Sequence, residues 1–346
     1  MKNKRHFYET LYALAAAGPD RLRKHLEVAY HPNASWRGSH PLNEMVGLDN
    51  IEETIWRPLI RSFPDLERRD LILIGGPYEG RDYVATLGHY CGTFREDWLT
   101  IPATGKPVYL RYGEVHQVEN GRIVQSTCLW DLLDLIRQAG FWPIAPSLGV
   151  ESMWPGPITA DGIVLTKQDS EVSAASIAQT LAMHKTLADY NDLDHLGREG
   201  LLAMPQKDHW HPKMMWYGPS GIGTTRGLGG FVDDHQLPFR LAFPNRKGGD
   251  QITDMTKGGH YIQLGDGKYS VTGGWPSVQA MHLGGGFLGT GPTGKEVTMR
   301  VMDFYLHHEG KIRENWVPID IIELLLQMGI DVIARLQHLS GHNLAK

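Results

Sequence analysis

Two patterns of hydrophobic and polar positions follow one another along the chain, and the same succession occurs twice. Amphipathic segments with a helical period come first, at about 5–28 and 47–62, and again at about 170–204 and 226–243. Segments with a period of two follow and end in two strand pairs, 106–118 with 122–130 and 295–308 with 312–319. Helices followed by strands predict an α+β fold and not alternating βαβ units.

Each strand pair is joined by a short turn that is typical of a β-hairpin. The turns are Glu119-Asn120-Gly121 and Glu309-Gly310, and both contain a residue type that accepts a positive φ. A further helix is predicted after each pair, near 131–140 and 319–338. The sheets are therefore expected to be antiparallel.

An internal repeat explains why the succession occurs twice. Residues 104–140 match residues 293–329 at a constant offset of 189 without gaps, with eleven identities. Roughly two or three identities would be expected by chance. Shorter blocks recur at other offsets, including His31-Pro32 with His211-Pro212, and the pattern H-x-x-G-x-F at His89 and His282. We expect two copies of one domain, residues 1–141 and 166–346, joined by a proline-rich linker at 142–165.

The composition limits the partners that the chain is expected to have. Hydrophobic residues make up 41% and charged residues 21%, which favours packed domains over disorder. The formal net charge of −5 argues against a nucleic-acid partner, and the absence of a run of 18 apolar residues argues against a membrane span. The cysteines, Cys91 and Cys128, are too few for a disulfide framework and favour a reducing, cytoplasmic location.

A carboxylic acid interrupts the apolar face of the same strand in both copies. Alternate side chains of a strand share one face. In copy two this face carries Val297, Met299, Val301, Asp303 and Tyr305, and in copy one it carries Val108, Leu110, Tyr112, Glu114 and His116.

An apolar environment raises the pKa of a carboxylic acid towards the range that is useful for proton transfer. The alternative is a structural acid that is paired with a buried arginine or histidine. Arg111 and Arg300 alternate onto the opposite face, so neither is expected to be the direct partner. Asp303 and Glu114 are therefore candidate proton-transfer residues.

Histidines and large aromatic residues provide further candidates, although each of them is also compatible with ordinary core packing. His282 and His89 share the repeated motif and are candidates for the wall of a pocket. Candidate substrate-binding side chains are Trp36, Tyr112, Trp216, Trp275, Tyr305 and Trp316.

The sequence offers little support for a metal or a cofactor. His209-x-His211 has the spacing of two metal ligands on one strand face, but copy one has only His31 there. The glycine-rich run at 218–230 lacks the spacing and the lysine of a phosphate-binding loop, and no βαβ unit surrounds it. We therefore expect no metal and no cofactor.

Several motifs of each copy resemble those of the SnoaL-like polyketide cyclases, also called predicted ester cyclases, which have the NTF2-like fold. In copy two they are the tract H-L-G-G-G-F-L-G-T-G-P-T-G-K at 282–295, Asp303, and G-K-I-R-E-N-W at 310–316. Copy one keeps Thr104-Gly105-Lys106 but has Glu114 in place of the aspartate and Thr127 in place of the tryptophan. The resemblance extends over nearly the whole chain outside the linker.

The resemblance implies two tandem NTF2-like (cystatin-like) cone domains, in which a curved antiparallel sheet wraps around helices and a deep apolar cavity. It implies a lyase or isomerase that closes a ring in a small apolar or aromatic, polyketide-like ligand by intramolecular aldol condensation, without a cofactor. By position the base is Asp303 and, less closely, Glu114, with His282 and His89 as the pocket histidines.

The same fold also occurs in dehydratases, isomerases and non-catalytic proteins that bind hydrophobic ligands, so these functions remain alternatives. NTF2-like domains commonly pair sheet to sheet, which predicts a pseudo-dimer within the chain and leaves room for a homo-oligomer. Copy two matches the motifs better, so we expect it to be the active copy.

Overall fold

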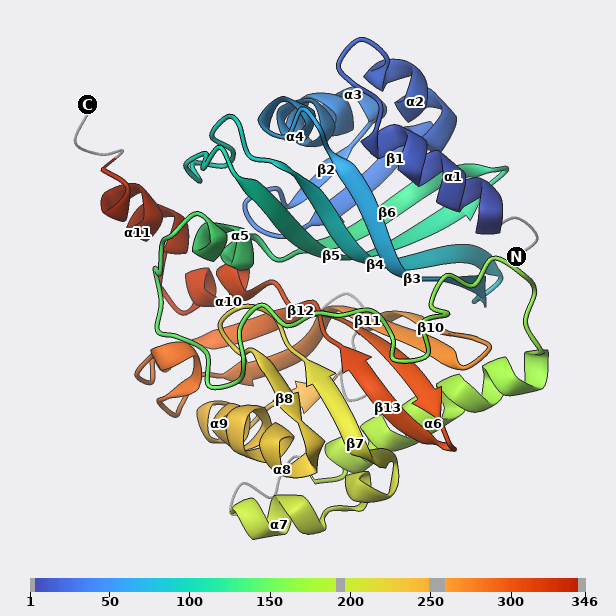
Figure 1. Ribbon diagram of the computed structural model, residues 1–346. Helices are drawn as coiled ribbons and strands as arrows, with labels where there is room; N and C mark the ends of the chain where they lie inside the picture. Colours follow the sequence, from blue (N-terminus) through green and yellow to red (C-terminus); the bar gives the residue numbers. More distant parts are fainter. Residues whose placement is uncertain (1–3, 191–196, 249–258, 342–346) are drawn as a thin grey trace. The chain divides into compact units, whose positions relative to one another are not determined.

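The computed structural model describes residues 4–190, 197–248 and 259–341, and contains two compact units (Figure 1). Unit 1 comprises Met1–Pro143, Gly156–Lys167 and Val332–Lys346, and unit 2 comprises Ile144–Pro155 and Gln168–Asp331. Each unit combines helices with a curved, mostly antiparallel sheet, which confirms the α+β prediction.

Unit 1 places its first four helices on one face of a six-stranded sheet (Figure 1). The helices are α1 (Lys4–Ala15), α2 (Leu22–Ala29), α3 (Leu48–Ile51) and α4 (Arg57–Ser62), with α5 (Leu132–Gln138) after the last strand and α11 (Val332–Leu339) from the C-terminal part. The strand order is β2 (Glu44–Val46), β1 (Tyr30–Gly38), β6 (Arg122–Trp130), β5 (Pro107–Glu119), β4 (Arg81–Thr93) and β3 (Glu67–Tyr78). Among the described strands of this sheet, β1 and β6 form the one parallel pair.

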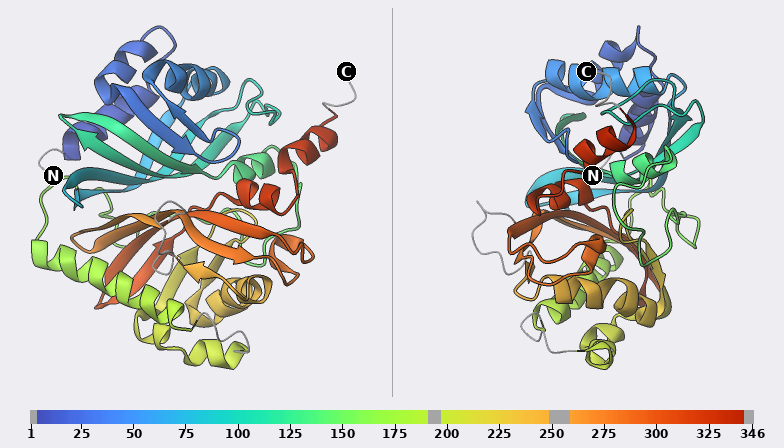
Figure 2. Two further views of the ribbon diagram at one scale, coloured as in Figure 1. Left: turned by 180° about the vertical axis from the view of Figure 1, so that it is seen from behind. Right: turned by 90° about the vertical axis from the view of Figure 1, so that its left-hand side faces the viewer.

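Unit 2 has the equivalent strand order, in agreement with the sequence repeat. Its sheet runs β10 (His260–Asp266), β11 (Tyr269–Met281), β12 (Glu296–His308), β13 (Lys311–Trp316), β7 (Trp210–Tyr217) and β8 (Thr224–Arg226), and β9 (Lys247–Gly248) pairs with β11. Its helices are α6 (Ser170–Ala188), α7 (Arg198–Ala203), α8 (Gly227–Phe231), α9 (Leu237–Ala242) and α10 (Ile321–Gln327). Helix α6 lies along β10 and β11 (Figure 2).

Local chemistry explains where the repeated elements begin and end. The aspartates before α5 and α10, Asp131 and Asp320, each accept a hydrogen bond from the backbone N–H three residues later and cap the helix. The same two aspartates bind Arg111 (2.7 Å) and Arg300 (3.1 Å), so both arginines point away from the inner sheet face, as the alternation predicts. The long helix expected at 319–338 is instead two helices, because Gly329 between them has a φ of 90°.

The helical segment before α9 contains a five-residue π-helix (Val232–Gln236), and unit 1 has the matching π-helix at Glu52–Trp56. A π-helical turn inside an α-helix is rare and is often found at functional sites. In unit 2 this turn carries His235, which faces the cavity described below. Among the described helices, none is long and apolar enough to cross a membrane.

The segment between the two repeats covers one sheet edge in each unit. In unit 1, the backbone N–H of Leu73 in the edge strand β3 donates to the Gly162 carbonyl oxygen (2.8 Å). The Leu73 carbonyl oxygen accepts from the N–H of Val164 (2.9 Å). In unit 2, Val150 and Thr224 of the edge strand β8 exchange two hydrogen bonds of 2.8 Å. An uncovered edge strand is an aggregation hazard, so this segment protects both sheets.

We predict that Gly162→Ala loosens the cover of β3, because an added Cβ would lie 2.2 Å from the Leu71 carbonyl oxygen. Backbone clashes of this kind cost about 1–3 kcal/mol. Hydrogen exchange at the amides of Leu73 and Val164 measures the effect and should become faster. Gly156→Ala is the control, because its Cβ would meet Leu71 Cδ2 at an ordinary 3.5 Å; equal exchange in both variants would contradict the prediction.

Candidate active site

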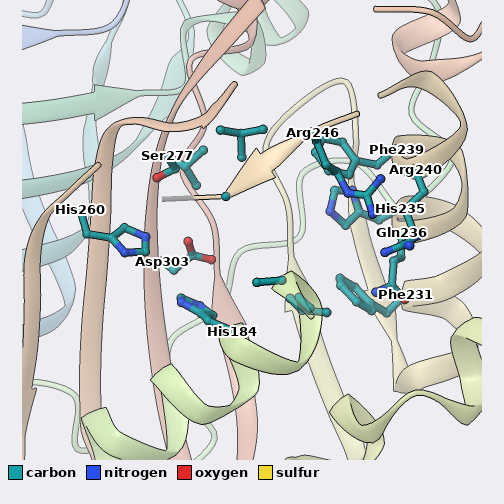
Figure 3. A pocket seen from close by; sticks show the side chains of 15 residues that line it. His184, Phe231, His235, Gln236, Phe239, Arg240, Arg246, His260, Ser277 and Asp303 are labelled. Atoms are coloured by element: carbon teal, nitrogen blue, oxygen red, sulfur yellow. The ribbon is translucent and has the colours of Figure 1, made fainter. Parts of the chain in front are cut away.

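Unit 2 contains a cavity of about 220 Å³ between helices and the inner face of its sheet (Figure 3). One wall comes from α6, β10, β11 and β12, and the facing wall comes from the segment α8 to α9 with β9. The lining residues are His184, Leu187, Ala188, Phe231, His235, Gln236, Phe239, Arg240, Arg246, Gly248, His260, Ser277, Val278, Val301 and Asp303.

Asp303 provides the carboxylate of this cavity, as the alternation along β12 predicts. Asn315 of β13 donates one hydrogen bond to Asp303 Oδ1 (3.3 Å) and a second to the Phe304 carbonyl oxygen (3.2 Å), so its amide is held in place. Burial raises the pKa of Asp303 to about 6, although Asn315, His260 and Tyr305 each lower it. Within the described part of the chain, no lysine or arginine pairs with this acid.

A histidine and a tyrosine flank the carboxylate. His184 of α6 has its Nε2 atom 2.7 Å from the Tyr305 hydroxyl oxygen, and Tyr305 lies two residues after Asp303 on the same face of β12. The His184 ring lies 5.9 Å from the ring of His260, which belongs to β10. Figure 3 shows Asp303 between His184 and His260. Three strands or helices thus bring titratable groups to one end of the cavity.

The facing wall is aromatic and carries positive charge. His235 stacks on Trp216 (4.1 Å, 16° between ring planes) and on Phe239 (5.6 Å), and burial lowers its pKa to about 3, so it is neutral at pH 7. Arg240 and Arg246 also line the cavity, and both are buried. This wall suits a flat apolar ligand that carries polar oxygen atoms.

Glu114 occupies the matching position of unit 1 but has a different environment. Arg68 of β3 binds its Oε2 atom (2.8 Å), while Tyr90 (3.0 Å) and Trp130 (2.9 Å) bind Oε1. The guanidinium of Arg68 keeps the pKa of Glu114 well below its ordinary value despite complete burial. The predicted rise in the pKa is therefore confirmed for Asp303 and wrong for Glu114, because the partner comes from another strand.

The other unit 1 candidates belong to the packed core around this ion pair. Tyr112 donates to Asp70 (2.6 Å) and lies under the Arg68 guanidinium (4.6 Å), and Trp36 packs edge-on against Trp130 (6.0 Å). His89 pairs in register with Arg111, on the sheet face opposite to Glu114, and contacts Tyr109. The structure thus does not bring His89 and Glu114 together.

His282 is also distant from the acid of its own unit. It follows β11, whose Ala280 pairs with Val297, so it lies more than six strand residues, or roughly 20 Å, from Asp303. Its Nδ1 atom bonds to the Thr293 hydroxyl (3.1 Å), its ring packs on Phe243 (5.2 Å), and the residue is fully buried. It does not line the cavity.

The four aromatic candidates of unit 2 divide into two groups. Trp216 stacks on His235, and Tyr305 contacts His184, so each of them contacts a residue that lines the cavity. Trp316 stacks on Tyr217 (5.1 Å) and donates to the Pro155 carbonyl oxygen (3.0 Å), whereas Trp275 packs under Arg300 (4.5 Å). These last two side chains have structural contacts and do not line the cavity.

Sequence reasoning missed the cavity residues that come from helices and from β10, notably His184, His235 and His260. The helical period gives one signal for His184. It lies four residues after the buried Thr180 of α6, and is therefore on the same face of the helix. No comparable signal marks His260, which reaches the cavity through strand pairing. Among the residues that the structure describes, no group of three His, Cys, Asp or Glu side chains is placed to hold a metal ion.

We predict that Glu114→Gln destabilises unit 1, because it leaves part of the Arg68 charge unpaired in the core. Breaking a buried ion pair costs about 3–5 kcal/mol, reduced here because Asp70 still binds Arg68 (3.0 Å). The decrease in the free energy of unfolding should have its full size above pH 4.5, where Glu114 is ionised in both states. It should shrink as the pH falls, because folding lowers the pKa of Glu114. Urea unfolding measures it. Glu67→Gln, in an exposed pair with Arg69, should leave the unfolding midpoint unchanged.

The opposite effect is predicted for Asp303→Asn, because an ionised Asp303 destabilises the folded state. A folded pKa of about 6, above the ordinary 3.8, means that stability is lost as the pH rises through this interval. The amide variant should therefore be more stable by about 1–3 kcal/mol at pH 7 and should lose this advantage towards pH 4. Urea unfolding at both pH values checks this; a less stable variant at pH 7 would contradict it.

Comparison with protein families identifies a relationship that fits this geometry. The profile of the family described as SnoaL-like polyketide cyclase matches residues 8–139 and 277–328, which is more than half of the chain. The matched residues include Glu114 and Asp303. Comparison with curated proteins finds no match.

Several solved structures are also similar to parts of the chain. A putative SnoaL-like polyketide cyclase from Jannaschia sp. CCS1 is 19% identical, with a TM-score of 0.32 over 38% of this chain and 90% of its own. IdmH, a putative polyketide cyclase from Streptomyces antibioticus, is 19% identical (TM-score 0.33; 39% and 98%). TsrD from Streptomyces laurentii is 23% identical (TM-score 0.33; 39% and 93%). On the evidence of the profile match, the chain belongs to the SnoaL-like polyketide cyclase family and has the NTF2-like fold.

Proposed function

We propose that unit 2 is a cofactor-independent cyclase site in which Asp303 removes a proton from a carbon between two carbonyl groups. The observation that supports this most directly is a carboxylate that faces a cavity and has no lysine or arginine partner among the described residues. With a pKa near 6, Asp303 is mostly ionised at pH 7 and is a stronger base than an ordinary aspartate.

The ring closure then needs no additional reactant. Asp303 accepts the proton from carbon, and the C–H electron pair moves into an enolate. The enolate carbon attacks a second carbonyl of the same molecule, which forms the new C–C bond and an alkoxide that must be protonated. Polar side chains along the cavity, among them Gln236 and Ser277, are placed to orient the carbonyl oxygens.

The proposed substrate is a small polyketide-like ester with an aromatic part. Phe231, Phe239, Val278 and Val301 supply apolar walls, and His235 adds a stacked aromatic surface. A cavity of roughly 150 Å³ is large enough for benzene, so about 220 Å³ accommodates one substituted ring.

Unit 1 is proposed to have a structural role in this chain. Its acid is bound by a cation and two neutral donors, which makes it a poor base. The alternative for unit 2 is a protein that only binds a hydrophobic ligand. An ion pair between Asp303 and an arginine or lysine would favour this alternative.

Hydrogen–deuterium exchange tests the proton-abstraction step without the natural substrate. Methyl 3-oxo-3-phenylpropanoate is a suitable probe, because its methylene group lies between two carbonyls next to one aromatic ring. The wild-type protein should accelerate exchange of this methylene group in D2O, as measured by NMR. Asp303→Asn should slow the catalysed exchange by roughly 10²–10⁴-fold.

The matched control is Asp233→Asn, which removes an exposed carboxylate that pairs with Arg198 (2.6 Å) outside the cavity. This variant should retain the wild-type exchange rate. A folded Asp303→Asn protein with the wild-type rate would refute Asp303 as the base. Binding of the probe without any acceleration by the wild type would favour the binding protein.

A further inference from the structure

Two buried glutamines are bonded to each other, and one of them lines the cavity wall that faces Asp303. Gln206 lies in the 3₁₀ turn Pro205–Asp208 and is fully buried, and its Nε2 atom donates to Gln236 Oε1 (2.8 Å). The same Nε2 atom donates to the Leu201 carbonyl oxygen (3.3 Å). Gln236 is the member of the pair that lines the cavity (Figure 3).

These two bonds determine which end of the Gln236 amide is available to a ligand. A carbonyl oxygen can only accept, so the atom of Gln206 next to the Leu201 carbonyl must be the nitrogen. Gln206 therefore binds the oxygen end of the Gln236 amide. The NH2 group of Gln236 has no hydrogen-bond partner among the described residues, and it is the group that Gln236 offers to the cavity as a donor.

The helical segment places this donor beside a row of aromatic side chains. Hydrogen bonds of a π-helix span five residues, which lets His235 and Gln236, four and five residues after Phe231, both line the cavity. Phe231, His235 and Phe239 recur every four residues, and the His235 ring lies 5.4 Å from the ring of Phe231 and 5.6 Å from that of Phe239. A flat ring against this row has its substituent next to Gln236.

Unit 1 indicates that the fold does not need the glutamine pair for stability. The π-helices of the two units match at an offset of 180, which places Trp56 at the position of Gln236 and Leu26 at that of Gln206. Both are buried hydrophobic residues. A buried amide is costly when a polar atom is left unbonded, and Gln206 Oε1 has no partner within the described ranges. The pair therefore points to a role at the cavity of unit 2.

We propose that Gln236 donates to the ketone oxygen of a substrate whose ketone is joined directly to its aromatic ring, and that Gln206 positions this donor. This inference rests on the proposed function, because it names the oxygen atom that receives the enolate charge. When Asp303 removes the proton, the C–H electron pair forms the carbon–carbon double bond of the enolate, and the π electrons of the ketone move onto its oxygen. The amide keeps both of its hydrogens, so this step needs no further reactant.

Carbon-13 NMR of bound methyl 3-oxo-3-phenylpropanoate, labelled at the ketone carbon, tests the hydrogen bond directly. Donation to a carbonyl oxygen moves the signal of its carbon downfield. In Gln236→Met, which keeps the length of the side chain but has no donor, the signal should move upfield from the wild-type position towards its value in cyclohexane. In Gln206→Met it should lie between these positions, because the amide is no longer held in one orientation.

The deuterium exchange assay measures the effect of the same variants on the rate. Gln236→Met should slow exchange by about 10²–10³-fold with a much smaller change in KM, because the donor stabilises the enolate more than the ketone. Gln206→Met should slow it less. Adding Gln206→Met to Gln236→Met should have no further effect, because Gln206 acts through Gln236. A further loss of rate in the double variant would overturn the positioning role.

Gln117→Met is the matched control, because it makes the same substitution at a buried glutamine of unit 1 that is bonded to Glu119 (3.0 Å). It should keep the wild-type signal and rate. An equal ketone signal in the wild type and in folded Gln236→Met would overturn the proposal. If Gln236→Met does not fold, the wild type decides, because a bound signal at the cyclohexane position also overturns it.

The two readouts separate this inference from the proposed function. A wild-type protein that binds the probe without accelerating exchange would refute the cyclase site, whereas the carbon-13 signal would still judge the hydrogen bond. Slowed exchange in Asp303→Asn with an unchanged rate in Gln236→Met would support the base and overturn the donor. A wild-type protein that does not bind the probe would contradict the proposed class of ligand and overturn the inference.

Discussion

A carboxylate on the inner face of a curved sheet either finds a cation or has its pKa raised by burial, which makes it a stronger base than an ordinary carboxylate. Unit 1 takes the first course, because Arg68 reaches Glu114 from a neighbouring strand and Tyr90 and Trp130 saturate the remaining oxygen. Unit 2 takes the second, because Asp303 has one weak amide donor and a cavity in front of it. This difference at one equivalent position explains the opposite pKa shifts of the two acids.

The packing around each acid follows from the same difference. Aromatic side chains close around the ion pair of unit 1 and leave it fully buried, with Tyr90 in contact with both Tyr112 and Trp130. In unit 2 the position of Trp130 is taken by Ile319, which cannot donate a hydrogen bond.

Much of the fold followed from the sequence because it depends on local patterns. Neighbouring residues in the sequence determine the period-two strands, the hairpin turns and the aspartate caps. The gapless repeat shows that these features occur twice. The alternation along β12 also identified Asp303. Pairing between distant strands is not local, so the partner of Glu114 was missed, and so were His184 and His260, which tertiary packing brings to Asp303. The glycine that separates α10 from α11 was read as part of one longer helix.

The most direct test of the account is to locate a bound ligand in crystals of the chain soaked with methyl 3-oxo-3-phenylpropanoate. The account predicts one molecule in unit 2, with its methylene carbon next to the Asp303 carboxylate and its ring against the wall formed by Phe231, His235 and Phe239. A molecule bound beside Glu114 or His282, with the cavity at Asp303 left unoccupied, would contradict it.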